Sequence, residues 1–141
     1  MMSSFIHHTI RDFLSLKNIY EIESNSIINF LMKRFSEEKF PQDYFICIFI
    51  NILDLKTMNL EYLGLGFQDL PVLIRNNQVK ELESKGMPIS PVIPEDTIKS
   101  NFEVKHIVLK DRDTLFFNTD GLVEQKNGDD DISYLIMKIN D

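Results

Sequence analysis

The sequence predicts an α+β fold, a layered sandwich in which helices cover antiparallel sheets. Two helical patterns come before Pro41, and the residues after it have the composition and punctuation of strands. The runs 44–53 and 115–117 are apolar without alternation, so both faces of these strands must be covered. The two helices can cover one face, and a second sheet would have to cover the other.

The first helix is expected to be capped by Ser3 or Ser4, because a serine hydroxyl can accept a hydrogen bond from the first turn. Its apolar residues follow the i, i+4, i+7, i+8 spacing of one helical face, and they are Ile6, Ile10, Phe13 and Leu14.

The second helix is expected to be capped by Ser24 or Ser26. Lys33 and Arg34 are predicted near its C-terminus, where positive charge stabilises the helix dipole. Its apolar residues share one side, and they are Ile27, Ile28, Leu31, Met32 and Phe35.

Strands are predicted over residues 44–53, 60–65, 72–74, 78–82, 102–109, 114–118 and 132–139. Asn76 and Asn77 predict a two-residue hairpin, because asparagine tolerates left-handed backbone angles. The strands 102–109 and 114–118 are predicted to pair around the acidic turn 110–113. Residues 86–94 predict an irregular loop, and residues 127–129 predict a turn.

Composition limits the classes of function. The 141 residues are 43% hydrophobic and 26% charged, as expected of one globular domain. The formal net charge of -7 argues against nucleic acid as a partner, because phosphates need a basic surface. No apolar run approaches the roughly 18–20 residues of a membrane span, and Arg11 and Asp12 lie where a signal peptide would be apolar. These features predict a cytoplasmic protein without a membrane partner.

One cysteine, Cys47, excludes an internal disulfide and a cysteine metal cluster. It lies within the apolar run 44–53, which predicts a buried and unreactive thiol. No serine or cysteine has a recognisable nucleophile setting, so no catalytic residue is predicted beyond candidate metal ligands.

Asp120 and Gly121 follow the apolar run 115–117, which mounts a carboxylate at the end of a strand beside a residue that lets the backbone turn. Taken alone, this pair predicts a hairpin or loop, and residues 129–131 predict a solvated turn. His7 and His8 would point about 100° apart on a helix, which favours a surface pair over a metal site.

Gly64 and Gly66 match two of the three glycines of a dinucleotide-binding loop. The third glycine and the following helix are missing, and Pro71 opens a strand instead. A tight bend or a bulge is therefore predicted here.

Five segments carry a further pattern in a fixed order: FICIFINILD (45–54), LEYLGLGFQDLPVLI (60–74), KGMPIS (85–90), LKDRDTLFFNTDGLVE (109–124) and DDISYLIMKI (130–139). This set resembles the PPM family of metal-dependent protein serine/threonine phosphatases, in its SpoIIE-like branch. The similarity covers nearly the whole chain, and the last two segments are its most specific part.

The resemblance implies a PPM-phosphatase-like αββα sandwich and a single phosphatase domain over residues 1–141. It implies two divalent ions, Mn2+ or Mg2+, whose bound water hydrolyses phosphoserine or phosphothreonine of a regulatory protein in signal transduction. Carried over by position, Asp120 would be one metal ligand and Asp130 the other. Thr119, Gly121 and Asp131 would support them.

The chain departs from the family pattern at several positions. No Gly-Asp pair followed by a Gly-His-Gly or Gly-Lys-Gly turn precedes Phe45, so a third aspartate ligand is missing. Phe67 stands where a histidine is usual, and Ser90 and Arg112 each replace a glycine. Only a short turn separates Glu124 from Asp129. The resemblance therefore implies a domain that lacks the first metal-binding strand and is shortened near its end.

Two hypotheses stay open at this point. In the first, the chain is an active phosphatase whose missing aspartate comes from another segment or subunit. In the second, it is a catalytically inactive relative that binds a partner protein, or a gene remnant. In both, the missing strand would leave a sheet edge open, which predicts self-association as a homodimer.

Overall fold

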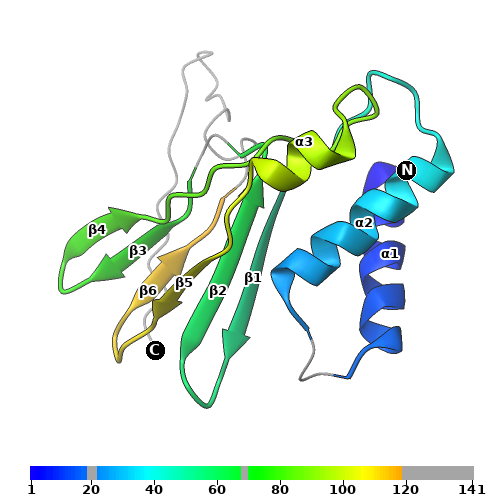
Figure 1. The fold of residues 1–141 in the computed structure, drawn as a ribbon. Coiled ribbons are helices and arrows are strands. Elements are labelled where there is room, and N and C mark those ends of the chain that lie inside the picture. The colour runs from blue at the N-terminus through cyan, green and yellow to red at the C-terminus, as the bar shows by residue number, and fades with distance from the viewer. Residues whose placement is uncertain (19–21, 68–69, 119–141) are drawn as a thin grey trace, which may run out of the picture. The chain divides into compact units, whose positions relative to one another are not determined.

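The fold is taken from a computed structural model, which describes residues 1–18, 22–67 and 70–118. In chain order, its elements are α1 (Met2–Leu16), α2 (Ser24–Glu38), β1 (Ile48–Asp54), β2 (Asn59–Leu65), β3 (Val72–Arg75), β4 (Gln78–Glu81), α3 (Glu95–Ser100), β5 (Lys105–Val108) and β6 (Thr114–Phe116) (Figure 1). The strands form two antiparallel sheets, β1-β2-β5 and β4-β3-β6. The predicted α+β class is confirmed.

The chain divides into two compact units. The first unit contains all three described helices and the sheet β1-β2-β5. The second unit contains the sheet β4-β3-β6. The strand predicted over 132–139 and the turn predicted over 127–129 lie outside the described residues.

The core of the first unit lies between α2 and the sheet. Helix α2 packs on β1 and β2, and α1 packs on α2 (Figure 1). The five apolar residues predicted to share one side of α2 are all buried, so this prediction is confirmed: Ile27, Ile28, Leu31, Met32 and Phe35. Ile50, Leu63 and Leu65 meet them from the sheet.

Helix α1 begins at Met2, so Ser3 and Ser4 lie inside its first turn and do not cap it. Phe13 is buried as predicted, but Leu14 is 45% exposed and Thr9 is buried instead. Among the described elements, α1 packs chiefly on α2, and one helix covers a narrower stripe than a sheet would.

The N-terminus of α2 is satisfied by a carboxylate from the sheet. Helix α2 begins at Ser24, whose backbone N–H and hydroxyl both donate to Glu61 Oε1, at 2.6 and 2.5 Å. Ser24 therefore donates, and neither serine acts as the predicted cap. A carboxylate at this end also interacts favourably with the helix dipole.

Helix α2 ends at Glu38 and has no basic residue in its last turn, so the predicted place of Lys33 and Arg34 near the C-terminus is wrong. The Arg34 guanidinium instead lies 5.2 Å from the Phe30 ring centroid and 3.7 Å from the Asp12 carboxylate of α1.

Strand β1 covers only part of the apolar run 44–53. Pairing with β2 begins at Ile48, and the residues before it make a single bridge, between Ile46 and Ile89. Cys47 precedes the paired region and is exposed, so the prediction of a buried thiol is wrong.

The two neighbouring strands of the hairpin are buried differently. Among the described strands, β1 lies at the sheet edge, with Ile50 buried and Asn51 and Leu53 exposed, so the prediction that both its faces are covered is wrong. Strand β2 lies between β1 and β5 and buries residues on both faces, with Tyr62 on one and Leu63 on the other.

The bend predicted at Gly64 and Gly66 is found at Gly66, whereas Gly64 lies within β2 and pairs with Phe49. Gly66 has a φ of 71°, and a Cβ at this position would lie 2.8 Å from Cys47 Sγ. A Cβ at Gly64 would lie 2.7 Å from the Phe49 ring. Both positions therefore need glycine, one for its backbone angle and both for the close packing around them.

A short helix was not predicted from the sequence. Helix α3 follows the loop that ends at Pro94, with Glu95 and Asp96 in its first turn and Lys99 in its last. These charges suit the helix dipole, and the Lys99 ammonium lies 3.8 Å from Glu95. None of the described helices is long and apolar enough to cross a membrane.

The second unit contains a confirmed hairpin. Strands β3 and β4 pair through a turn at Asn76 and Asn77, whose φ angles of 50° and 61° are both left-handed. Two such residues form the type of turn that matches the twist of a hairpin.

The strand pair predicted around residues 110–113 is wrong. Strand β5 pairs with β2, and β6 pairs with β3, so the two strands belong to different sheets. Arg112, with a φ of 67°, makes a left-handed bend between them. A short polar turn between two apolar runs looks the same in a sequence whether the runs pair or separate.

Candidate functional site

The predicted metal centre lies in the C-terminal part of the chain. Asp120 and Asp130, with the supporting residues Thr119, Gly121 and Asp131, lie outside the described residues. The described residues do include β6, which ends at Phe116, four positions before Asp120 in the sequence. Strand β6 is therefore the described element that comes immediately before the candidate site in the sequence.

Strand β6 is short and depends on β3 for its place. Only three residues of β6 pair with β3, with Leu115 opposite Leu73 at the centre. Leu73 is buried, and the three residues of β6 are half-buried. A three-residue ladder has few backbone hydrogen bonds, so side-chain contacts must contribute to its register.

One such contact is a two-point ion pair between Arg75 and Asp113. Arg75 Nε donates to Asp113 Oδ1 at 2.9 Å, and Nη2 donates to Oδ2 at 2.6 Å. The Asp113 side chain is 4% exposed and that of Arg75 is 28% exposed. The hydrogen bonds to Asp113 raise the pKa of Arg75, so its positive charge is kept at any working pH.

Several described carboxylates have structural roles. Glu61 accepts two hydrogen bonds at the start of α2, and Asp113 pairs with Arg75. Asp54 accepts from the backbone N–H groups of Lys56 and Thr57, at 2.8 and 3.2 Å, and these bonds lower the pKa of Asp54. Each of the three carboxylates thus accepts hydrogen bonds from protein donors.

Residues 1–18, 22–67 and 70–118 contain no group of three or more histidine, cysteine, aspartate or glutamate side chains that could hold a metal ion. His7 and His8 are both exposed, as predicted, with ring centroids 5.7 Å apart. A hard divalent ion needs several oxygen ligands, and the donors that suit it, Asp120 and Asp130, are carboxylates. The ligand chemistry of these two residues therefore fits Mn2+ or Mg2+.

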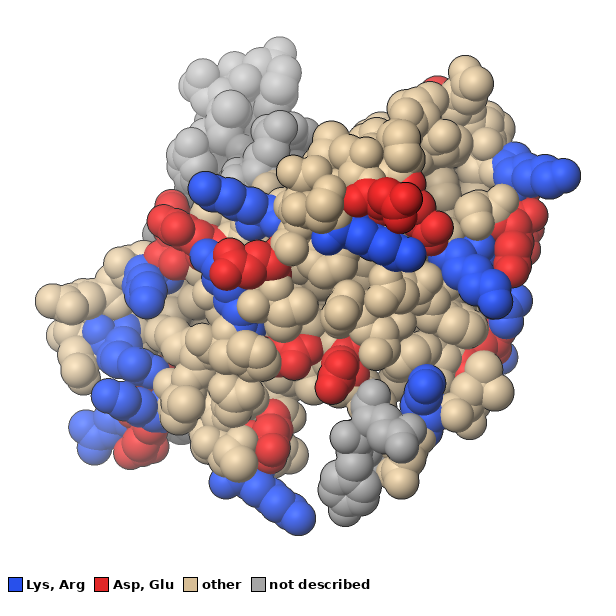
Figure 2. Space-filling model, in the orientation of Figure 1, with Lys and Arg blue, Asp and Glu red and all other residues tan. Residues whose placement is uncertain are grey.

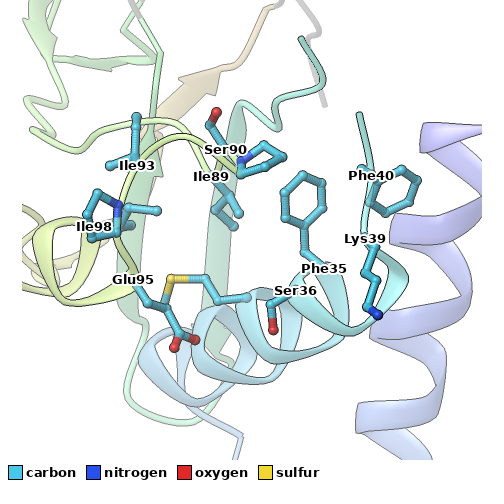
Figure 3. A pocket seen from close by; sticks show the side chains of 12 residues that line it. Phe35, Ser36, Lys39, Phe40, Ile89, Ser90, Ile93, Glu95 and Ile98 are labelled. Carbon is cyan, nitrogen blue, oxygen red and sulfur yellow. The ribbon is translucent and has the colours of Figure 1, made fainter. Parts of the chain in front are cut away.

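A pocket of about 310 Å³ opens in the first unit between the C-terminal half of α2, the loop before α3 and α3 itself (Figure 3). Phe35, Ile89 and Ile98 give it a buried apolar lining. Lys39 and Glu95 line it from exposed positions. This volume is at the lower end of the range of small-molecule sites.

The pocket has two hydroxyl groups, and both have structural roles. Ser36 donates to the Lys33 carbonyl at 2.8 Å, and the Ser90 hydroxyl accepts from Val92 N–H at 3.4 Å. No histidine lines the pocket, so neither serine has the adjacent base that activates a nucleophile. The pocket can hold an apolar group, but neither of its two serines lies beside a histidine base.

On the face drawn in Figure 2, several basic groups lie together at the lower left with acidic groups beside them, and elsewhere the described surface carries both signs. A nucleic-acid backbone needs a continuous basic surface, and this face does not provide one.

Sequence reasoning missed the residues that tie distant segments together. Glu61 and Ser24 are 37 positions apart, and Arg75 and Asp113 are 38 apart. One local signal was present for the second pair, since arginine and aspartate both flank predicted strands. This signal could be used only if the pairing of the two strands were already known.

Comparisons with known proteins agree with the described fold. The model of the family described as stage II sporulation protein E (SpoIIE) matches residues 1–139. A crystal structure of the RsbU and RsbW domains of a Mycobacterium tuberculosis protein is similar, with a TM-score of 0.64 and 19% identity. The match covers 87% of this chain and 32% of that one, so the chain spans about a third of that structure. No curated protein matches the chain.

Proposed function

Because the chain belongs to the SpoIIE family of PPM-type phosphatases, we propose that it hydrolyses phosphoserine or phosphothreonine of a regulatory protein. The observation that carries the proposal is the family match over residues 1–139, which includes the Thr119-Asp120-Gly121 and Asp130-Asp131 sequences. The fold of the described residues is compatible with this family, since it has helices and two antiparallel sheets.

In this proposal, Asp120 and Asp130 hold Mn2+ or Mg2+, and Thr119, Gly121 and Asp131 support the loop geometry. The ion, when bound, lowers the pKa of coordinated water and so supplies a nucleophile near neutral pH. The two carboxylates bind and orient the ion. The ester bond between phosphorus and the serine or threonine oxygen breaks, and the products are inorganic phosphate and a free hydroxyl group.

Two carboxylates alone would bind such an ion weakly. The ion must lose part of its hydration shell, and each additional oxygen ligand from the protein offsets more of that cost. The proposal therefore includes a third carboxylate from another segment or subunit. A second copy is one source. Strand β1, at the edge of its sheet, has β2 as its strand neighbour among the described residues, and an open edge favours strand addition. We propose a homodimer on this basis, in a cytoplasmic protein of acidic composition.

The alternative is a catalytically inactive phosphatase-like domain that binds a protein partner. The departures from the family pattern at Phe67, Ser90 and Arg112 favour it. The chain would then present its surface to a regulatory protein without cleaving phosphate.

The two functions are separated by an assay of phosphate release from phosphoserine and phosphothreonine peptides, with Mn2+ and with a chelator. The first proposal predicts metal-dependent release that Asp120→Asn removes and that Asp43→Asn, an exposed control aspartate, preserves. No release from the wild type, at any metal concentration, would contradict the phosphatase and favour the inactive binding domain.

Light scattering over a concentration series tests the proposed homodimer. A monomer at every concentration would contradict it.

A further inference from the structure

The pocket beside helix α2 lies entirely within the first unit, and contacts inside that unit hold its walls (Figure 3). One wall is the loop before α3. Ile89 of this loop is tied to Ile46 by two backbone hydrogen bonds, with N···O distances of 2.8 and 3.0 Å. Another wall is aromatic, since the Phe35 and Phe40 rings stack with their centroids 4.9 Å apart. Walls held in this way need little rearrangement to accept a ligand, which lowers the cost of binding.

The interior of the pocket is apolar. Four of the lining side chains are each at most 4% exposed: Met32, Phe35, Ile89 and Ile98. A ligand that covers such surface removes it from contact with water, and this burial is the main source of affinity in apolar sites. The volume of about 310 Å³ is small, so it suits a short hydrocarbon body better than a drug-sized molecule.

The charged groups at the edge of the pocket indicate the head group of the ligand. The Glu95 carboxylate lies 3.8 Å from the Lys99 ammonium, so its charge is offset within α3. Lys39 is exposed and takes part in none of the ion pairs found among the described residues. Glu37 and Glu38 precede Lys39 but do not line the pocket. The charge offered to a ligand at this edge is therefore positive, which is complementary to an anion.

We propose that this pocket binds a small amphiphilic monocarboxylate. Its hydrocarbon body lies between α2 and the loop before α3, and its carboxylate pairs with the Lys39 ammonium at the edge. Because Lys39 is exposed, the carboxylate keeps its contact with water and avoids the large cost of burying an ion. Binding here needs neither a metal ion nor phosphatase activity, so it is tested separately from the proposed function.

A titration of the full chain with sodium octanoate, followed by amide NMR, tests binding. We expect saturable shifts of the backbone amide signals of Ser36, Ile89 and Ile98, which line the pocket, and no shift at His106 on β5. Sodium acetate has the head group without the hydrocarbon body and should cause none of these shifts. The absence of saturable shifts at the three pocket amides would overturn the proposal, and so would equal shifts with acetate.

The carboxylate is tested through Lys39. We expect Lys39→Gln to weaken octanoate binding by about two- to fivefold, the range for an exposed ion pair, and to leave 1-octanol binding unchanged. Lys33→Gln is the matched control, because Lys33 is an exposed lysine of the same helix that does not line the pocket. An equal effect of Lys39→Gln on octanoate and 1-octanol would overturn the carboxylate. The occupant would then be an uncharged apolar group, such as a side chain of a partner protein.

The hydrocarbon body is tested by filling the pocket from an exposed position, which leaves the buried lining unchanged. We expect Ser36→Trp to weaken octanoate binding by about tenfold or more, because the indole takes apolar surface from the ligand. Glu37→Trp, one position along and outside the lining, should keep the wild-type affinity. Thermal unfolding without ligand shows which variants are folded.

Unchanged octanoate binding by a folded Ser36→Trp variant would overturn the placement of the ligand in this pocket. If this variant does not fold, the wild-type titration and Lys39→Gln still decide the proposal. The charge-reversing Lys39→Glu gives a further decision, since we expect it to bind octylamine more tightly than octanoate. A preference for octanoate that survives this reversal would overturn the role of Lys39.

Discussion

Helix α2 in the first unit and strand β6 in the second are held in place by different kinds of interaction. Helix α2 buries five apolar side chains in a cluster that also receives residues from β1 and β2. Among the described residues, strand β6 pairs with β3 at three positions, and the Arg75–Asp113 ion pair lies next to them. Many non-directional contacts tolerate the change of one member, whereas a directional contact depends on the geometry of both of its partners.

The largest effect is expected in the apolar core of the first unit. Leu31 is completely buried, so Leu31→Ala removes buried methyl groups and leaves a cavity, with an expected loss of about 2–5 kcal/mol in the free energy of unfolding. Urea unfolding measures this loss.

Leu14→Ala is the matched control, because Leu14 lies on α1 and is 45% exposed. Its expected loss is about 0.5 kcal/mol or less. Equal losses at the two positions would contradict the assignment of the core to the face of α2 that meets the sheet.

A smaller effect is expected where a directional contact joins α2 to the sheet. Glu61→Gln removes the negative charge that accepts from Ser24 N–H and the Ser24 hydroxyl, with an expected loss of about 1 kcal/mol. A double-mutant cycle with Ser24→Ala isolates the contact, and Glu103→Gln, at an exposed position, is the control. Additive losses in the cycle would show that the two residues do not interact.

The smallest effect is expected at the exposed turn between β1 and β2. The backbone N–H groups of Lys56 and Thr57 lower the pKa of Asp54 in the folded chain. Its contribution to stability is therefore present above the ordinary pKa of an aspartate and is lost as the pH falls through the lowered value. Asp54→Asn should flatten the acid side of the profile of unfolding free energy against pH. An unchanged acid side would contradict the role of the turn.

Features that depend on residues close together in the sequence could be predicted, whereas features that depend on distant residues could not. Helix α2 was predictable because its stripe depends only on residues three and four apart. The turn at Asn76 and Asn77 was predictable because the backbone angles it needs are local. Helix α3, with six residues, is too short to show a repeating pattern.

The partners of β5 and β6 could not be predicted, because the residues that select them lie far away in the sequence. The contact of Arg75, next to β3, with Asp113, next to β6, spans 38 positions. The exposure of Cys47 was missed for a related reason, since the apolar run around it continues before the point where β1 begins to pair. For the candidate site, the sequence supplied the carboxylates Asp120 and Asp130, and the described structure added the strand that leads to Asp120.

The most direct test of the proposed metal site is isothermal titration calorimetry of Mn2+ binding to the wild type, to Asp120→Asn and to the exposed control Asp43→Asn. The proposal predicts binding in the wild type and the control, with loss in Asp120→Asn, because removal of one charged ligand weakens a site of few carboxylates most strongly. Binding that is unchanged in Asp120→Asn, or absent from the wild type at millimolar Mn2+, would contradict it.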